Sequence, residues 1–177
     1  PHGILHSDIK PANIMVTPDN EIRLIDFNIA LALGEEGAIR VGFSSGYASP
    51  EHYGIDYSAV NVTQGDSAVQ TQIPSDIAAT SMSGSGSGSS STRRNSILLD
   101  VRSDIYSLGA TLYHLLTGTR PAPDATQVKP ISSPNVSPAV AAVIMKAMAP
   151  DPTQRYQTAQ EMLDAFRRLH ENDPRAK

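Results

Sequence analysis

Apolar residues recur at helical spacing between residues 100 and 171, where three segments can be distinguished. Each segment places its apolar residues three or four positions apart, which is the spacing of one face of an α-helix. The first segment ends at Thr117-Gly118, the second opens at Ser137-Pro138, and the third begins near Thr158. The expected core-facing residues are Ile105, Leu108, Leu112, Leu115 and Leu116; Val140, Val143, Ile144 and Met148; and Met162, Leu163, Phe166 and Leu169.

A shorter, β-like pattern occupies the N-terminal part of the chain. Residues 14–16 and 22–25 have strand character, and residues 17–20 between them have the composition of a tight turn. We therefore expect a β-hairpin with Asn13 at its start and Asp26 at its end. Because a hairpin returns its two ends to the same place, these two side chains should face one small space.

A change in composition interrupts the chain between these two patterns. Residues 57–97 are rich in Ser, Thr, Gly and Gln, a composition that buries too little apolar surface to offset the entropy of ordering. We interpret this segment as a disordered insertion within one domain, with a boundary between two domains as the alternative. Residues 1–56 and 98–171 then form the two parts of the domain, and 172–177 a tail. The expected class is α+β, mainly α.

Bulk composition narrows the functional classes. The 177 residues carry a formal net charge of −4, which gives no electrostatic reason to expect nucleic acid as a partner. The chain has no cysteine, so a disulfide framework and a thiolate metal site are excluded. No apolar run is long enough to cross a membrane, and no signal peptide opens the chain. These features predict a cytoplasmic protein.

Candidate chemistry lies in the first 28 residues. Asp8, Lys10, Asn13 and Asp26 follow one another in the order used by phosphoryl-transfer sites of the protein-kinase type. Such a site needs an acceptor for the proton of the attacking hydroxyl and oxygen ligands that hold Mg²⁺ against the nucleotide phosphates. Asp8 can supply the acceptor, and Asn13 and Asp26 can supply the ligands.

Five motifs in sequence order resemble those of the C-terminal lobe of Hanks-type serine/threonine protein kinases of the bacterial kind. They are the catalytic loop at 6–13, the metal motif at 26–28, the end of the activation segment at 46–51, the start of a buried helix at 100–109, and the turn at 151–156. The resemblance implies a kinase-like C-terminal lobe with a short β-hairpin at the catalytic loop and several packed helices. It also implies ATP and Mg²⁺ as cofactors and a protein as substrate.

The resemblance assigns a role to each site residue. Asp8 would be the catalytic base, and Lys10 would lie near the γ-phosphate and offset developing charge. Asn13 and Asp26 would hold Mg²⁺, so that Lys10, Asn13 and Asp26 together would bind the cofactor. Ser44 would be the hydroxyl residue that bridges the catalytic aspartate and lysine in serine/threonine kinases.

Other positions have structural roles in the family or depart from its pattern. Glu51 and Arg155 would form a buried ion pair, and Asp104 would hold the catalytic loop by hydrogen bonds. Ser7 replaces the arginine that usually precedes the catalytic aspartate, which implies activity independent of activation-loop phosphorylation. Asn28 replaces the glycine of the metal motif at a place where positive φ is expected.

No Gly-rich phosphate loop, strand lysine or partner glutamate precedes the catalytic loop in these 177 residues. We therefore expect an N-terminal kinase lobe to be supplied in cis or in trans, and the chain to be inactive alone. The leading function is ATP-dependent phosphoryl transfer to Ser or Thr of proteins. A pseudokinase-like binding module or remnant is the alternative. A small-molecule phosphotransferase is less favoured because such enzymes usually lack a lysine at the position of Lys10.

Overall fold

The computed structural model describes residues 4–27, 31–32, 43–58 and 99–171 of the chain. Its α-helices are α1 (Val101–Thr117), α2 (Pro138–Ala147) and α3 (Ala159–Glu171), and its strands are β1 (Ile4–Leu5), β2 (Ile14–Val16), β3 (Ile22–Leu24) and β4 (Leu31–Ala32). The expected α+β class, dominated by helix, is confirmed in these residues. The predicted insertion at 57–97 lies almost entirely outside them.

The predicted hairpin is present. Strands β2 and β3 pair antiparallel with Ile14 opposite Leu24, and the turn is closed by a hydrogen bond from Asn20 N to Thr17 O at 2.9 Å. Asn20 has a φ of 61°, a left-handed conformation that asparagine tolerates better than most residues. The sequence did not reveal the second pair, in which β1 and β4 also run antiparallel. Two-residue strands are too short to show a period.

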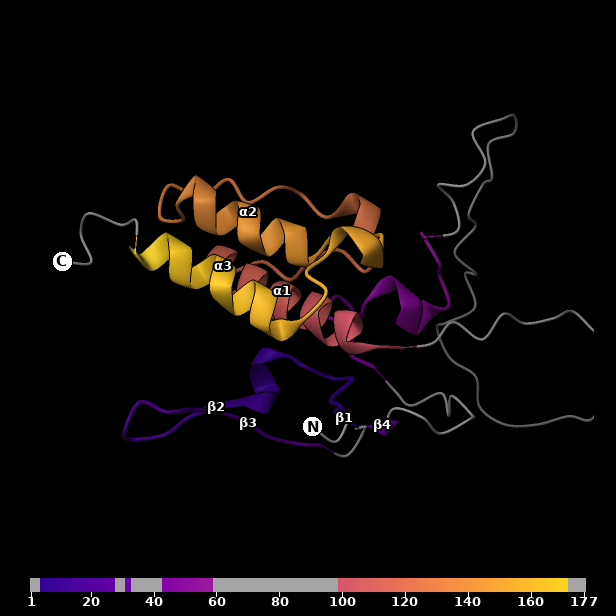
Figure 1. The fold of residues 1–177 in the computed structure, drawn as a ribbon, viewed down its shortest axis with the longest axis horizontal. Coiled ribbons are helices and arrows are strands. Elements are labelled where there is room, and N and C mark those ends of the chain that lie inside the picture. The colour runs from indigo at the N-terminus through magenta and orange to yellow at the C-terminus, as the bar shows by residue number, and fades with distance from the viewer. Residues whose placement is uncertain (1–3, 28–30, 33–42, 59–98, 172–177) are drawn as a thin grey trace, which may run out of the picture.

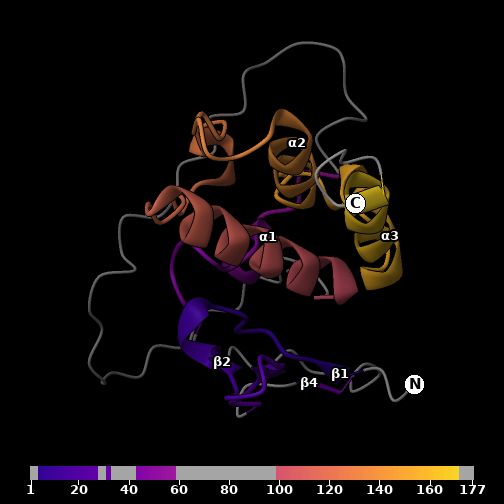
Figure 2. The ribbon, with the colours of Figure 1, turned by 90° about the vertical axis from the view of Figure 1, so that its left-hand side faces the viewer.

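Helix α1 is the middle layer of the molecule, and its ends are set by local chemistry. The Asp100 carboxylate accepts a hydrogen bond from Arg102 N at 2.8 Å and caps the N-terminus. Gly118 ends the helix with a φ of 69°, donating from its N to His114 O. Helices α2 and α3 lie on one side of α1, and the loop that carries Asp8 lies on the other together with the small β-sheets (Figures 1 and 2).

The core between the helices depends on a close approach at Gly109. A Cβ atom there would lie 2.9 Å from Met148 Cγ and 3.0 Å from Ala147 Cβ, so a larger residue would separate α1 from the end of α2. Around this contact lie two connected groups of buried apolar side chains. They include Tyr47, Tyr106, Ala110, Tyr113, Ile144 and Met148 in one group, and Ile105, Val143, Ala147, Tyr156, Met162 and Ala165 in the other.

Three leucines expected in the core are exposed instead. Leu115 is 61 % exposed, and Leu116 and Leu163 are each 43 % exposed. The helical periods were identified correctly, but α1 is covered from two directions and does not bury a single apolar stripe. Its second buried side is lined by small polar residues such as Ser107 and Thr111, whose hydroxyls donate to the helix carbonyls four residues earlier.

No helix within the described residues is both long and apolar enough to cross a membrane.

Candidate phosphoryl-transfer site

The loop that carries Asp8 is fixed from a distance by one carboxylate on α1. Asp104 accepts hydrogen bonds from the backbone nitrogens of His6, at 2.8 Å, and Ser7, at 2.9 Å. Ser7 is buried and adopts a φ of 64°, so the chain makes a tight bend immediately before Asp8. The predicted role of Asp104 as the anchor of this loop is confirmed.

His6 connects the same loop to the end of the hairpin. Its Nδ1 accepts from Asp8 N at 3.3 Å, which assigns the proton to Nε2 for donation to Ile25 O at 3.1 Å. The imidazole also packs against Phe27, with ring centroids 4.7 Å apart. Asp8 and the segment that carries Asp26 are therefore held by the two sides of one buried ring.

Lys10 brings together the two residues predicted to lie beside it. Its Nζ donates to Asp8 Oδ2 at 2.5 Å and to Ser44 Oγ at 2.8 Å, although Ser44 is 34 positions away in the chain. Asp8 is 6 % exposed, whereas Lys10 keeps 25 % of its side chain exposed. The carboxylate is thus buried at the base of the site, and the ammonium group lies between it and solvent.

Asn13 completes the polar surroundings of Asp8. It ends the short 3-10 helix Pro11–Asn13, and its buried amide nitrogen donates to Asp8 O at 2.9 Å and contacts Asp8 Oδ2 at 3.4 Å. The amide nitrogen is therefore committed to Asp8. The side-chain carbonyl oxygen of Asn13 is the atom left to accept a cation.

Asp26 lies where the hairpin returns. Ile25 N donates to Asn13 O at 2.9 Å, which brings the chain positions of Asn13 and Asp26 together as expected. Asp26 is exposed and has a φ of 64°, so the left-handed conformation in this motif falls on the aspartate itself. The prediction of positive φ at Asn28 lies outside the described residues.

These donors suit Mg²⁺ when the nucleotide is also present. Among the described residues, no three His, Cys, Asp or Glu side chains form a metal site by themselves. Mg²⁺ commonly takes one or two carboxylates together with substrate phosphates and water. One carboxylate at Asp26 and one amide oxygen at Asn13 fit that pattern of partial protein ligation.

A cleft of about 450 Å³ opens beside the Lys10 ammonium group. Its lining residues are Lys10, Pro11, Ala12, Ser44, Ser45, Tyr47 and Arg120. Arg120 comes from the loop after α1, and sequence reasoning did not single it out because no motif includes it. The cleft thus joins the Asp8 loop, the segment after Ser44 and the end of α1 in one concave surface.

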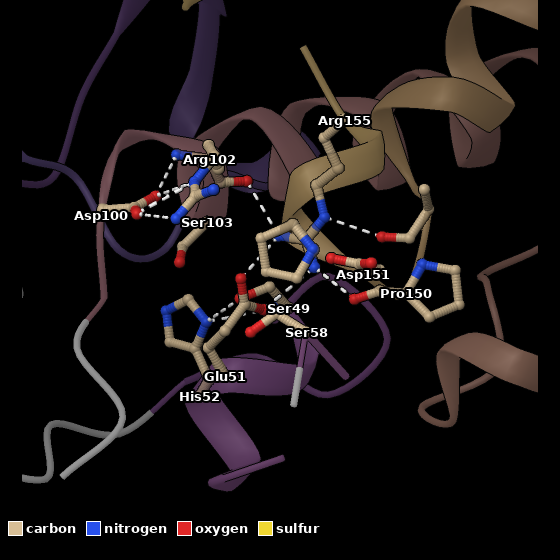
Figure 3. Close-up of polar contacts among 12 residues, drawn as sticks. Ser49, Glu51, His52, Ser58, Asp100, Arg102, Ser103, Pro150, Asp151 and Arg155 are labelled. Carbon is tan, nitrogen blue, oxygen red and sulfur yellow. Dashed lines mark hydrogen bonds and ion pairs between the residues drawn. The ribbon is translucent and has the colours of Figure 1, made fainter. Parts of the chain in front are cut away.

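Glu51 and Arg155 form the predicted ion pair (Figure 3). Glu51 lies in the 3-10 helix Pro50–Tyr53, a few residues after the part of the chain that lines the cleft. The two guanidinium nitrogens reach the two carboxylate oxygens at 2.7 and 3.1 Å, and the Arg155 side chain has no exposed surface. Arg155 also donates to three backbone carbonyls, at Ala149, Pro150 and Arg102. One arginine therefore ties the activation segment, α1 and the turn before α3 to one another.

Burial shifts the pKa values of two side chains near this ion pair, His52 and Tyr106. It lowers the pKa of His52 below its ordinary value, while the Glu51 carboxylate opposes the shift. His52 Nδ1 lies 2.8 Å from Ser49 Oγ and accepts from Ser49 N at 3.2 Å, which stabilises the bend at the end of the activation segment. Burial raises the pKa of Tyr106, whose ring lies 5.0 Å from the Arg155 guanidinium carbon.

Comparison with known proteins adds independent evidence. Residues 1–64 match the model of the protein kinase domain family. The chain is 32 % identical over 189 residues to serine/threonine-protein kinase PknB of Mycolicibacterium smegmatis, covering 96 % of this chain and 24 % of that protein. It is 30 % identical over 192 residues to PknB of Mycobacterium tuberculosis, covering 98 % of this chain and 24 % of the relative. The chain spans about a quarter of the length of these relatives.

A solved structure supports the fold. The ROP18 kinase domain in complex with AMP-PNP and sucrose matches with a TM-score of 0.52 at 22 % identity, covering 96 % of this chain and 39 % of that one. At this identity the match shows a protein-kinase-like fold and nothing about activity. The sequence relatives place the chain in the bacterial Hanks-type family of serine/threonine protein kinases.

Proposed function

We propose that this chain carries out ATP-dependent phosphoryl transfer to serine or threonine side chains of proteins. The observation that carries the proposal is the bridge made by Lys10 Nζ between the Asp8 carboxylate and the Ser44 hydroxyl at the edge of an open cleft. A buried carboxylate, a cation and a hydroxyl converge there within hydrogen-bonding distance. Such convergence is what a positioned proton acceptor requires.

In the proposed reaction, the hydroxyl of the substrate enters the cleft and donates its proton to Asp8. Its oxygen forms a bond to the γ-phosphorus of ATP as the bond to the β-phosphate oxygen breaks, which leaves ADP. Lys10 exchanges part of its contact with Asp8 for the transferring phosphoryl oxygens and stabilises their charge. Asn13 keeps the Asp8 carboxylate oriented through its amide nitrogen.

Asn13 and Asp26 are proposed to hold Mg²⁺, which when bound neutralises phosphate charge and orients the γ-phosphate. The catalytic residues of the proposal are thus Asp8, Lys10 and Ser44. Assignment of the described residues to the C-terminal lobe of a kinase domain belongs to the same proposal. It is supported by a catalytic loop and hairpin packed on helices, and pairing with an N-terminal lobe stays a prediction.

The test is phosphoryl transfer by the protein in its native full-length form. Wild-type protein and Asp8→Asn are incubated with Mg²⁺ and ATP labelled in the γ-phosphate, with a mixture of serine- and threonine-containing peptides. Incorporation of label should fall by a factor of roughly 100 to 10,000 in Asp8→Asn, because removal of a general base typically has that effect. Equal incorporation by both proteins, or none by the wild type, would contradict the proposal.

A binding measurement separates the enzyme from a non-catalytic module. ATP with Mg²⁺ should raise the midpoint of thermal unfolding, since a ligand that binds only the native state stabilises it by mass action. A shift that Asp26→Asn abolishes, together with label transfer, supports the enzyme. The same shift without any transfer would support the pseudokinase-like alternative.

A further inference from the structure

The cleft beside Lys10 carries a second cation whose charge no acidic group of the described residues balances. Lys10 is engaged by Asp8 and Ser44, but Arg120, which also lines the cleft, has no hydrogen bond or ion pair within the described part of the chain. Arg120 is exposed, and its guanidinium group retains its donors for a ligand.

Arg120 is nevertheless held in place. Its guanidinium carbon lies 5.3 Å from the centroid of the Tyr47 ring, a cation–π arrangement. The Tyr47 hydroxyl is fixed in turn by a 2.6 Å hydrogen bond with His114 Nδ1, and Tyr47 itself is 5 % exposed. The buried tyrosine therefore provides a rigid platform on which the arginine side chain rests.

Gly46 allows the stem of Arg120 to approach this platform closely. A Cβ atom at position 46 would lie 2.8 Å from Pro121 O and 2.9 Å from Arg120 Cγ, and Gly46 also has a φ of 83°. Both the conformation and the lack of space require glycine there. The backbone after Ser44 and the aliphatic part of Arg120 are therefore packed together, which reduces the freedom that the arginine would lose on binding a ligand.

We propose that Arg120 makes this cleft select protein segments that carry an anionic group, a carboxylate or a phosphate, close to the acceptor hydroxyl. The inference rests on the proposed function, because Asp8 and Ser44 define where the hydroxyl lies. Arginine suits this task, since its planar fork binds carboxylate and phosphate oxygens in pairs. Asp8 balances the charge of Lys10, whereas no described carboxylate balances that of Arg120, so a lysine or arginine in the substrate would be disfavoured.

The first experiment measures peptide binding by fluorescence anisotropy with the native full-length protein. A neutral peptide with one serine is compared with peptides that carry Glu, Lys or phosphoserine at each neighbouring position. The best Glu peptide should bind about three- to fivefold more tightly than the neutral one, which is the upper part of the range for one exposed ion pair. Arg120→Glu should reverse the order of the Glu and Lys peptides, and Arg120→Lys should retain part of the preference.

Arg167→Glu is the matched control. Arg167 lies on α3 and is 63 % exposed. Its replacement by Glu changes the net charge by the same amount as Arg120→Glu. It should keep the preference of the wild type, and a loss equal to that of Arg120→Glu would overturn the inference in favour of a general charge effect. Absence of an anionic preference in the wild type, or its persistence in Arg120→Glu, would also overturn it.

The phosphoserine arm identifies the source of the anionic group. Tighter binding of the phosphoserine peptide than of the Glu peptide supports recognition of an already phosphorylated segment, and equal or weaker binding supports a carboxylate. Label transfer to the same peptides separates this inference from the proposed function. Transfer without an Arg120-dependent preference would refute the inference alone, whereas Arg120-dependent binding without transfer would refute the proposed function alone.

Discussion

Two ion pairs of this molecule have similar chemistry and opposite surroundings. Arg155 and Glu51 are 0 % and 6 % exposed, and the other hydrogen bonds of the guanidinium group within the described residues are made to backbone carbonyls. Lys10 and Asp8 are 25 % and 6 % exposed, and the lysine reaches a hydroxyl at the edge of a cleft. The first pair is closed to ligands and links segments of the fold. The second has a cation that can exchange partners, as the proposed role of Lys10 requires.

The largest expected effect comes from removal of the cation of the closed pair. Arg155→Met leaves the Glu51 carboxylate buried without its partner, which should lower the free energy of unfolding by about 3–5 kcal/mol. Chemical denaturation followed by circular dichroism measures the change. Arg23→Met is the control, because the Arg23–Glu21 pair is 61 % and 62 % exposed. Equal free energies of unfolding for Arg155→Met and Arg23→Met would contradict a structural role for the Arg155–Glu51 pair.

The same change in the open pair should affect activity more than stability. Lys10→Met is expected to lower phosphoryl transfer by a factor of roughly 100 to 1,000, the range for loss of one preorganised electrostatic group. The free energy of unfolding should change far less than in Arg155→Met, because Lys10 is partly solvated and the Asp8 carboxylate keeps its contact with the Asn13 amide. Kinetic and denaturation measurements are made in parallel, with a variant of the exposed Lys129, Lys129→Met, as the control. Unfolding of the protein by Lys10→Met would contradict the difference between the two pairs.

Asp104 should affect both stability and activity, because it holds the loop that carries Asp8 in place. Asparagine at 104 keeps one oxygen, so one of the two backbone nitrogens of His6 and Ser7 would lose its acceptor. Asp104→Asn should lower the free energy of unfolding by about 1–3 kcal/mol and also reduce phosphoryl transfer. Thermal unfolding and kinetics of Asp104→Asn should be compared with the surface variant Asp164→Asn. Loss of stability with full activity would argue against its positioning role.

The smallest effect is a dependence of stability on pH near the closed pair. Burial lowers the pKa of His52 below 6.5, so between that lowered value and 6.5 the unfolded chain binds a proton that the folded chain does not. Stability should therefore fall as the pH falls from about 6.5 and should be unaffected by His52 above it. Unfolding midpoints across this range, for wild type, His52→Gln and His170→Gln, measure the effect. An unchanged slope in His52→Gln would refute it.

Local sequence patterns predicted much of the scaffold because they depend on nearby residues. Helix periods, the cap at Gly118 and the turn at residues 17–20 are short-range features, and the sequence predicts each of them correctly. Burial was predicted less well. Leu115, Leu116 and Leu163 are exposed although they have the correct period, because the surroundings of a helix depend on elements far away in the chain.

The candidate site divides in the same way. The sequence by itself determined which residues are chemically able to act, namely Asp8, Lys10, Ser44, Asn13 and Asp26, through their types and order. The resemblance predicted that Asp8, Lys10 and Ser44 meet, but only the tertiary structure decided that Lys10 rather than Ser44 makes the bridge, and that Arg120 rests on Tyr47 beside them. The Lys10–Ser44 and Arg120–Tyr47 contacts join positions separated by 34 residues or more. The physical reason is that side-chain type is a local property, whereas charge, burial and distance in a cleft arise from packing between distant segments.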